Sequence, residues 1–360
     1  MKKILYRIFL AVNVFFAITL LISYLAVHIS PGDFALPAFF GLAYPYLLLI
    51  NIIILIAWIA LLRFEALISS IVIAIGFNHF SNYIKLSKPS VDKTNTFKVL
   101  SYNVRLFNYY ESKSGVYSLK KVVDFIKTQQ ADIICLQEFF ILGNPALEEE
   151  EIIKGLGGRY YTHMKVFKVS KNRYYGIVTF SRYPIIKKGE IVHNNSSSLS
   201  IYSDVVIQKD TFRIFNNHLQ SFLLKNMNKS FIEELSSSEN KETIDEMKNL
   251  SRSLKKGFAT RSLQAQLVKS YINKSTYPVI VAGDFNDTPV SYTYTKIRKG
   301  LNDSFVTSGY GAGFTYRGNY PPNRIDYILY DNKLINSFFE RKKVRFSDHY
   351  PIIAYFRKKD

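Results

Sequence analysis

The sequence has almost no cysteine, and Cys135 is the single example in 360 residues. A lone cysteine excludes a disulfide framework within the chain, and it excludes a zinc site built from several thiolates. Cys135 lies in the apolar run 132–136, so we expect it to be a small buried hydrophobic side chain. Neither disulfides nor cysteine-bound zinc therefore organise this protein.

Charge is scarce in the first quarter of the chain. Residues 1–90 contain six of the 47 Lys and Arg residues and two of the 28 Asp and Glu residues. Residues 91–360 therefore hold 41 basic and 26 acidic residues, a net charge of +15. Such a field attracts anions, including nucleic acid, phosphorylated metabolites and acidic lipid headgroups. A role in solubility alone explains the same charge equally well.

Two long runs in this first quarter contain no charged residue. They cover 8–27 and 39–62, which are 20 and 24 residues long, and each is long enough to cross a bilayer as a helix. A cleaved signal peptide is the alternative for the first run, but its apolar core would be shorter and no second run would follow. A third run, 66–77, spans a membrane only if it extends to Ile84 with a tilt, and otherwise lies in the interface.

We therefore predict a membrane anchor over 1–84 with two or three transmembrane helices. Three basic residues within the first seven positions, and none in the loop around 31–33, place the N-terminus in the cytoplasm. Three spans would put the remaining chain outside the cytoplasm, although the basic residues within 85–93 favour the opposite side. Residues 85–96 are polar, contain Pro89 and lack periodicity, which predicts a linker.

From residue 97 onward, short apolar or alternating runs recur between helical and polar stretches. Strands are predicted at 97–102, 133–136, 176–180, 203–207, 212–215, 278–282, 325–329 and 352–356, and helices at 118–129 and 259–272. This mixture, without an internal repeat, predicts a layered α/β or α+β domain over 97–360.

Polar side chains with metal-binding or acid–base chemistry follow or interrupt several of these strands. They are Asn103, Glu138, His218, Asp284, Asn286, Asp326, Asp348 and His349. Mg²⁺ prefers one or two carboxylates together with waters and phosphate oxygens. Glu138, helped by Asn103 and Asp348, is therefore the candidate metal site.

The other five residues suit catalysis of phosphoester hydrolysis. Asp284 would hold and activate a water molecule, and Asn286 would orient that water and donate to a phosphoryl oxygen. Asp326 would fix the tautomer of His349. His218 would donate to the phosphate or to the leaving oxygen, stabilising the charge that develops there.

Each of these segments also has a purely structural interpretation. The turn 283–286 is explained by a tight turn and a helix cap, and 348–351 by a turn before proline. Glu138 would then be a solvated edge residue, Asp326 a surface ion-pair partner and His218 a core histidine. The other four histidines lie outside such segments. His28 and His79 border the apolar runs, His163 and His193 lie in polar surroundings, and all four are interpreted as structural or exposed.

Six motifs in a fixed order strengthen the catalytic interpretation: SYNVR, LQEF, NNHLQS, AGDFND, RIDYIL and SDHYPI. Together they resemble the endonuclease/exonuclease/phosphatase superfamily, which includes deoxyribonuclease I, over residues 97–357. The resemblance implies an α+β fold, a four-layer sandwich of two mixed β-sheets flanked by helices, here preceded by transmembrane helices. The active site would lie at one end of the sandwich.

The resemblance also implies roles for these residues. Asn103 and Glu138 would be metal-site residues, and Asp348 would contribute near the metal. The water and the phosphate would be handled by Asp284 and Asn286, and His349 would be oriented by Asp326. His218 stands where some repair endonucleases have a tyrosine, which favours the deoxyribonuclease I, sphingomyelinase and phosphatase branches. The expected cofactor is Mg²⁺, with Mn²⁺ as the alternative.

Three functions remain open on this basis. The motifs and the +15 charge favour a metal-dependent phosphoester hydrolase of the nuclease-type phosphodiesterase class. The anchor, with the apolar segment 222–224, instead suggests a membrane-lipid phosphoesterase, sphingomyelinase-like or an inositide phosphatase. A non-catalytic, membrane-tethered binding protein is the third, weakened because all six motifs keep their polar residues.

The expected partners are the lipid bilayer and a phosphate-containing substrate, either nucleic acid or phospholipid. No obligate protein partner is inferred. The apolar segments are similar to those of bacterial multi-pass members of the superfamily. We therefore expect an integral protein of the bacterial inner membrane, with its catalytic domain outside the cytoplasm.

Overall fold

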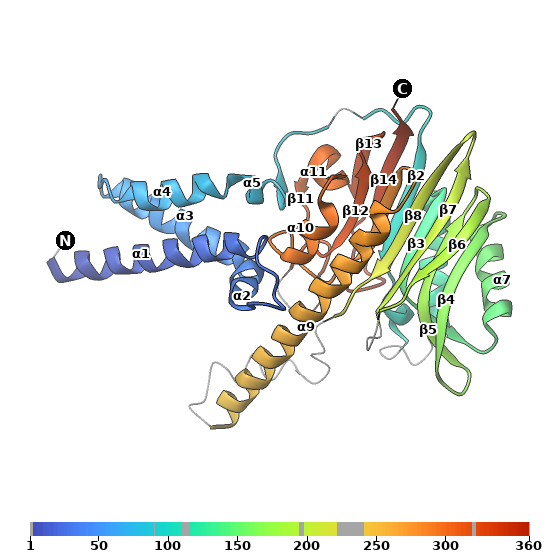
Figure 1. Ribbon diagram of the computed structural model, residues 1–360, viewed down its shortest axis with the longest axis horizontal. Coiled ribbons are helices and arrows are strands. Elements are labelled where there is room, and N and C mark those ends of the chain that lie inside the picture. Colours follow the sequence, from blue (N-terminus) through green and yellow to red (C-terminus); the bar gives the residue numbers. More distant parts are fainter. Residues whose placement is uncertain are drawn as a thin grey trace. The chain divides into compact units, whose positions relative to one another are not determined.

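The computed structural model describes residues 3–89, 91–109, 115–193, 198–221, 241–318 and 322–359 (Figure 1). The described chain forms two compact parts. The first comprises the residues up to Tyr83 with parts of 221–266 and 287–296, and the second comprises the rest. The apolar segment 222–224 lies outside the described residues.

The apolar first quarter is helical. Its helices are α1 (Lys3–Leu25), α2 (Leu36–Leu42), α3 (Tyr44–Ala60), α4 (Ala66–Ile75) and α5 (Phe77–Phe80). Helix α1 is long and apolar enough to cross a membrane, and α2 with α3 passes the same criterion only as a bent pair. The ten-residue α4 is shorter than a membrane span.

The prediction of one continuous helix over 39–62 was wrong. Helices α2 and α3 meet at an angle of 68°, with Ala43 between them. Pro45 lies at the start of α3, where it has no N–H to donate. Its ring would also clash with the carbonyl group of Gly41 in a continuous helix, which breaks the helix at this point.

The helices of this part turn polar side chains inward and apolar side chains outward. Asn13, Asn51 and Ser69 are fully buried. Ser69 Oγ donates to Asn13 Oδ1 over 2.7 Å, and Asn51 Nδ2 donates to the carbonyl oxygen of Phe16 over 3.0 Å. The exposed side chains are large and apolar, for example Ile18, Ile53, Ile56 and Ile71. A helix bundle in water has the opposite polarity.

The second part is built on two six-stranded mixed sheets. One has the order β13-β14-β2-β3-β5-β4, with β2 Phe97–Asn103, β3 Ile133–Leu142, β4 Tyr161–Ser170, β5 Arg173–Ser181, β13 Leu334–Arg341 and β14 Ile352–Lys358. The other has the order β10-β12-β9-β8-β7-β6, with β6 Ile185–Ile191, β7 Leu199–Ile207, β8 Asp210–His218, β9 Val279–Asp284, β10 Leu301–Asp303 and β12 Asp326–Asp331. The pairs β2–β3 and β8–β9 are parallel, and the other pairs in the two sheets are antiparallel.

Further helices and short elements complete the described chain, and α9 and α10 are divided between the two parts. They are η1 Arg105–Asn108, α6 Gly115–Gln129, α7 Pro145–Leu156, α9 Lys241–Asn273, α10 Tyr292–Arg298, α11 Ser304–Ser308 and the two-stranded pair β1 Ile84–Lys85 with β11 Gly311–Ala312. The α+β sandwich of two mixed sheets flanked by helices is therefore confirmed.

The central strands are apolar on both faces because each face is covered. In β2, Val99 packs in the core between the sheets, whereas Leu100 packs on the other face with Ile126 of α6. Cys135 belongs to the core between the sheets, as predicted. The edge strands β4, β6, β10 and β13 were not predicted. In β4 and β6 lysines interrupt the apolar run, and β10 has only three residues.

Two histidines expected to be structural or exposed are buried. His163 Nδ1 lies 2.9 Å from Ser203 Oγ, which joins β4 of one sheet to β7 of the other. His193 Nε2 lies 2.9 Å from Ser200 Oγ, also on β7. Burial lowers the pKa of each imidazole to about 4. Both histidines are therefore neutral structural groups at physiological pH.

The depressed pKa of His163 predicts a loss of stability in acid. The unfolded chain takes up this proton below about pH 6.5 and the folded protein only below about pH 4. Stability therefore falls as the pH decreases between these values, by about 1 kcal/mol for this ring after allowing for solvent screening.

We expect His163→Gln to reduce the drop in melting temperature between neutral and acidic pH, measured on the full chain in detergent. Ser203→Ala removes the same contact without removing a titrating group, so it should keep the pH dependence while lowering stability. Identical pH dependence in His163→Gln and the unmodified chain would contradict this assignment.

Candidate functional site

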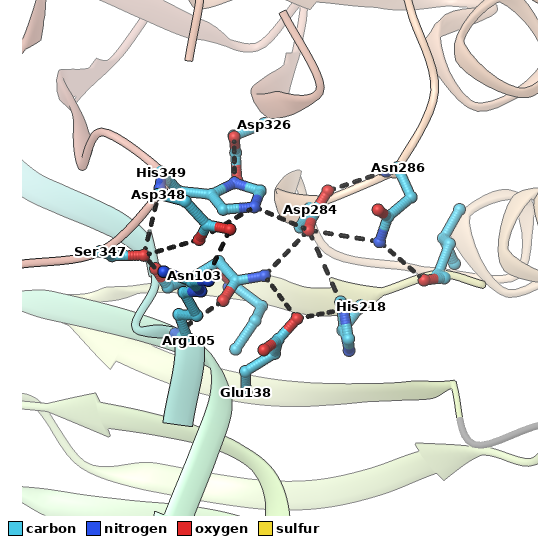
Figure 2. A network of polar contacts seen from close by, with 12 residues as sticks. Asn103, Arg105, Glu138, His218, Asp284, Asn286, Asp326, Ser347, Asp348 and His349 are labelled. Atoms are coloured by element: carbon cyan, nitrogen blue, oxygen red, sulfur yellow. Dashed lines mark hydrogen bonds and ion pairs between the residues drawn. The ribbon is translucent and has the colours of Figure 1, made fainter. Parts of the chain in front are cut away.

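Strand register brings the predicted polar residues to one end of the two sheets. In one sheet, His218 at the end of β8 is in register with Asp284 at the end of β9. Asp284 is in turn paired with Asp326 at the start of β12. Three neighbouring strands therefore present an imidazole and two carboxylates side by side. Figure 2 shows all eight predicted residues within one network of polar contacts.

Glu138 enters this network from the other sheet, through a bulge. The prediction placed it at a strand end, but β3 continues to Leu142. Leu136 pairs with Val178 and Phe139 with Gly176, so two residues, 137 and 138, face a single residue of β5. Glu138 has a φ of 51°. Such bulges re-aim a side chain, and this one turns the carboxylate of Glu138 toward the other sheet.

Asn103, at the end of β2, links the carboxylates of the two sheets. Its Nδ2 donates to Glu138 Oε1 over 3.2 Å and to Asp284 Oδ2 over 2.9 Å. Its Oδ1 accepts the backbone N–H of Arg105 over 3.0 Å. The side chain is completely buried. Asn103 therefore holds the buried carboxylate of Asp284 and the partly exposed carboxylate of Glu138 close together by hydrogen bonding to both.

His349 and Asp326 form the predicted pair. His349 Nδ1 lies 2.9 Å from Asp326 Oδ2, and its Nε2 lies 3.9 Å from Asp284 Oδ2 and 4.0 Å from Asp348 Oδ1. Burial alone would lower the pKa of His349. The carboxylates of Asp326 and Asp284 outweigh burial and hold that pKa well above its ordinary value. This ring is therefore a protonated donor with a fixed orientation.

His218 has the opposite character. Its Nδ1 lies 2.9 Å from the hydroxyl of Tyr175, and its Nε2 lies 3.5 Å from Glu138 Oε1. Burial lowers the pKa of His218. One site thus holds a neutral and a charged imidazole, as the different surroundings of two titratable groups allow.

Asp284 and Asn286 form a closed turn after β9. The backbone N–H of Asn286 donates to Asp284 Oδ1 over 2.8 Å, and its Nδ2 donates to Asp284 Oδ2 over 3.2 Å. Gly283 before them has a φ of 135°, and a Cβ there would lie 2.0 Å from the carbonyl oxygen of Asn217, so only glycine fits. Burial, followed by the charge of Asp326, raises the pKa of Asp284 to about 6.

Asp348 joins the network through Arg105 and Ser347. Its Oδ2 is 3.3 Å from Arg105 Nε, and its Oδ1 accepts from Ser347 Oγ over 3.3 Å. Ser347 Oγ is also 2.8 Å from the carbonyl oxygen of Asn103. The turn 105–108 has four consecutive left-handed residues, with φ between 47° and 54°, a conformation that costs energy in non-glycine residues.

Four supporting residues were not predicted: Arg105, Tyr175, Thr315 and Ser347. Arg105 and Ser347 belong to the SYNVR and SDHYPI motifs, so their motif membership was the available signal. Thr315 Oγ1 accepts the backbone N–H groups of Ile325 and Asp326 over 3.0 and 3.1 Å. Nothing in the local sequence points to Thr315 or Tyr175, because only the fold brings them to the site.

The donor set fits a hard divalent cation. Its side chains offer carboxylate and amide oxygens, the ligands that Mg²⁺ and Mn²⁺ prefer. Burial raises the pKa of Glu138, so a bound cation would compensate a carboxylate that water solvates poorly. Asp284, Asp326 and His349 also have ligand atoms within 4.8 Å of one another. Within that group, Asp326 and His349 are hydrogen-bonded to each other, which occupies one ligand atom of each.

Comparison with known families matches two separate regions of the chain. Residues 100–349 match the model of the endonuclease/exonuclease/phosphatase family. Residues 6–83 match a model described as a domain of unknown function. No curated protein matches the chain.

Solved structures share the fold at low sequence identity. An endonuclease/exonuclease/phosphatase from Bacteroides vulgatus aligns with a TM-score of 0.54 and 17% identity, over 74% of this chain and all of that one. The human Nocturnin catalytic domain with bound sulfate gives 0.54 and 18%, over 75% and 96%. Truncated TDP2 from Caenorhabditis elegans gives 0.50 and 17%, over 73% and 98%. At these identities the likeness shows the fold alone.

The raised pKa of the Glu138 carboxyl predicts that its substitution has opposite effects on stability and on cation binding. A carboxyl with a raised pKa stabilises the fold at low pH and loses that contribution as the pH rises through its folded pKa. Glu138→Gln keeps an oxygen for Asn103 Nδ2 but carries no charge. We expect it to stabilise the metal-free protein by about 1 kcal/mol at neutral pH and to lose the stabilisation by millimolar Mg²⁺.

Melting temperatures with EDTA and with Mg²⁺ measure both effects. Glu190→Gln on β6, which removes an exposed carboxylate paired with Lys165, is the matched control and should keep the Mg²⁺ response. Equal Mg²⁺ stabilisation of Glu138→Gln and the unmodified protein would show that Glu138 is not a ligand.

Proposed function

This chain belongs to the endonuclease/exonuclease/phosphatase family, and from that premise we propose that it is a divalent-metal-dependent phosphodiesterase attached to a membrane. Members of this family are hydrolases that act on phosphoester bonds. The observation that carries the proposal is the buried network in which Asn103 joins Glu138 to Asp284 while His349 is paired with Asp326. A purely structural role would leave these acids and imidazoles without a reason to converge.

The cation would be held by Glu138, with Asn103 and Asp348 beside it. When bound, Mg²⁺, or Mn²⁺ as the alternative, would neutralise charge on the phosphate oxygens. Asp284 would accept the proton of the attacking water, because its carboxylate is fixed by Asn286 and its pKa of about 6 leaves it ionised at neutral pH. Asn286 would orient the same water.

The two histidines would act on the phosphate. His349 would donate from Nε2, since Asp326 holds Nδ1 and keeps the ring charged. His218 would donate a hydrogen bond from Nε2 to the phosphate or the leaving oxygen, since Tyr175 occupies Nδ1. Neither step moves a proton onto Asp326, which serves as a positioning residue.

The anchor is proposed from the polarity of the N-terminal helices. Their outward faces carry isoleucine, leucine and phenylalanine, while Asn13, Asn51 and Ser69 pack inside, as in helices that associate within lipid. We propose the division into an anchor over 1–84, a linker over 85–96 and a catalytic domain over 97–360. A multi-pass arrangement in the bacterial inner membrane, with the catalytic domain outside the cytoplasm, completes the proposal.

A basic hairpin beside the site favours nucleic acid as the substrate. Strands β4 and β5 continue past Tyr175, the partner of His218, and project beyond the neighbouring strands (Figure 1). Three exposed basic residues lie at this tip: Lys168, Lys171 and Arg173. A polyanion that enters the site would pass this tip, and such contacts dominate nucleic-acid affinity.

Membrane lipid is the second candidate substrate. The same hairpin exposes Phe167 and Val169, and the proposed anchor would keep the site near phospholipid headgroups. A sphingomyelinase-like enzyme or an inositide phosphatase would use these apolar side chains to reach the lipid.

Loss of the catalytic side chains tests the proposed chemistry. Asp284→Ala and His349→Ala should each lower kcat/KM toward a phosphodiester by about 10²–10⁴-fold, and EDTA should abolish the activity of the unmodified chain. Asp210→Ala, at the opposite end of β8 where the carboxylate pairs with Lys358, is the matched control and should stay fully active. Absence of EDTA-sensitive hydrolysis across DNA, RNA, phospholipid and inositide substrates would leave only the non-catalytic binding role.

The hairpin charges test the substrate class. Lys168→Gln with Lys171→Gln should raise KM for DNA and reduce the salt slope of log(kcat/KM) by about 1–2. Hydrolysis of bis(p-nitrophenyl) phosphate should stay unchanged.

The control is Lys333→Gln with Lys359→Gln, which removes the same charge. Both lysines are exposed and adjacent, since Lys359 N donates to the carbonyl oxygen of Lys333, and both are far from the hairpin in the sequence. This control pair should leave KM for DNA as it is. Efficient cleavage of phospholipid vesicles together with no cleavage of DNA would select the lipid alternative.

A further inference from the structure

A second cavity lies in the catalytic part, away from the residues of the network in Figure 2. It has a volume of about 560 Å³ and is bounded by the linker on one side and by β13 with the β11 segment on the other. The volume is within the range of small-molecule sites. Its walls carry aromatic side chains, among them Phe338 and Phe339 of β13.

The charge lining this cavity is positive. Lys88 from the linker and Arg341 and Lys343 from the end of β13 line it, against the single acid Glu340. Glu340 Oε2 already pairs with Lys342 Nζ at 2.8 Å. Lys88 and Lys343 are exposed, and Lys88 Nζ lies 5.4 Å from the centre of the Tyr310 ring. Arg341 already donates from one Nη group to the carbonyl oxygen of Phe314, so its remaining N–H groups would be the ones that reach a ligand. Aromatic walls with several cations at the mouth suit a molecule with an anionic head and an apolar tail.

The position of Lys88 in the sequence indicates that such a molecule would be a membrane lipid. Lys88 follows Ile84, where the apolar N-terminal region ends, by four residues. Even a fully extended chain keeps Lys88 within about 14 Å of Ile84. Anionic lipid headgroups attract basic residues that lie close to a membrane-attached segment. The linker that forms one wall of the cavity begins where the proposed anchor ends, and it carries Lys85 and Lys88.

The opposite wall of the cavity leads to the active site. Strand β1 pairs Ile84 with Ala312 and Lys85 with Gly311 of β11. A few residues further on, Thr315 accepts the backbone N–H of Asp326, and Tyr316 forms a β-bridge with His349. A ligand between the linker and β11 would therefore hold the segment 311–316, which supports the Asp326–His349 pair.

We propose that this cavity binds an anionic membrane phospholipid, with its phosphate between Lys88, Arg341 and Lys343 and the start of its acyl chains against the aromatic wall. The inference rests on the proposed membrane attachment and not on hydrolysis. The lipid is a bound ligand at a site separate from the catalytic residues, and it is not consumed there.

Binding is measured by native mass spectrometry of the full chain released from detergent micelles with phosphatidylglycerol or phosphatidylcholine. The Asp284→Ala background prevents turnover, so the result is independent of whether the chain is a hydrolase. We expect phosphatidylglycerol to remain bound and phosphatidylcholine to be lost. Adding Lys88→Gln with Lys343→Gln should lower the bound fraction of phosphatidylglycerol at least about tenfold, since two charge-assisted contacts are removed.

The control pair, Lys333→Gln with Lys359→Gln, has the same change in net charge and should retain the lipid. Melting temperatures verify that both double variants are folded. Equal retention in the two pairs, or equal loss in both, overturns the proposal, because binding would then follow total charge or occur elsewhere. Glycerol 3-phosphate serves as a soluble competitor that carries the phosphate ester without acyl chains. If it displaces phosphatidylglycerol at equal concentration, the ligand is a free phosphate ester and the lipid assignment is wrong.

Discussion

The burial of several carboxylates in one small volume is the constraint on which the site depends. Glu138 and Asp284 come from different sheets and would repel each other, yet the Nδ2 group of Asn103 donates to both. His349, kept charged by Asp326, adds a positive charge beside them. Buried charges persist only where partners and hydrogen bonds compensate them. The compensation here is incomplete, as the raised pKa values of Glu138 and Asp284 show, which is the condition in which a divalent cation binds well.

Backbone irregularities concentrate at the same place. The bulge at Glu138, the left-handed turn 105–108 and the positive φ of Asn286 all border the network. Each costs energy in isolation, and each is held by the regular strands around it. Regular sheets supply the rigid frame, and the irregular positions aim the side chains that a regular strand would send elsewhere. Stability and function are thus divided between the middle of the sandwich and one end of it.

The N-terminal helices and the linker connect the fold to its surroundings. The polarity of the helices is the basis of the proposed anchor, because Asn13 and Ser69 are hydrogen-bonded to each other inside while isoleucine faces outward. The chain that follows is fixed to the second part, since β1 pairs with β11. From β11 a short segment reaches the Asp326–His349 pair. The proposed membrane attachment and the geometry of the site therefore share one stretch of backbone.

Much of this architecture could be predicted from the sequence, because it depends on local patterns. Apolar runs predicted the helical first quarter and the central strands, and the six motifs predicted the sandwich and the eight polar residues that meet at its end. Pro45 broke the predicted second span for a local reason that the sequence already contained. The edge strands were missed because their exposed faces leave no apolar signal.

Tertiary structure alone decided how the polar residues interact. Strand register places His218 beside Asp284, and a bulge turns Glu138 toward the other sheet. Tyr175 and Thr315 contact the site residues from positions outside the six motifs. Likewise, only packing made His163 and His193 buried and neutral. The sequence by itself determined which chemical groups are available. Which of them are charged, and which face one another, depends on burial and on distances between segments far apart in the chain, and no local pattern encodes those.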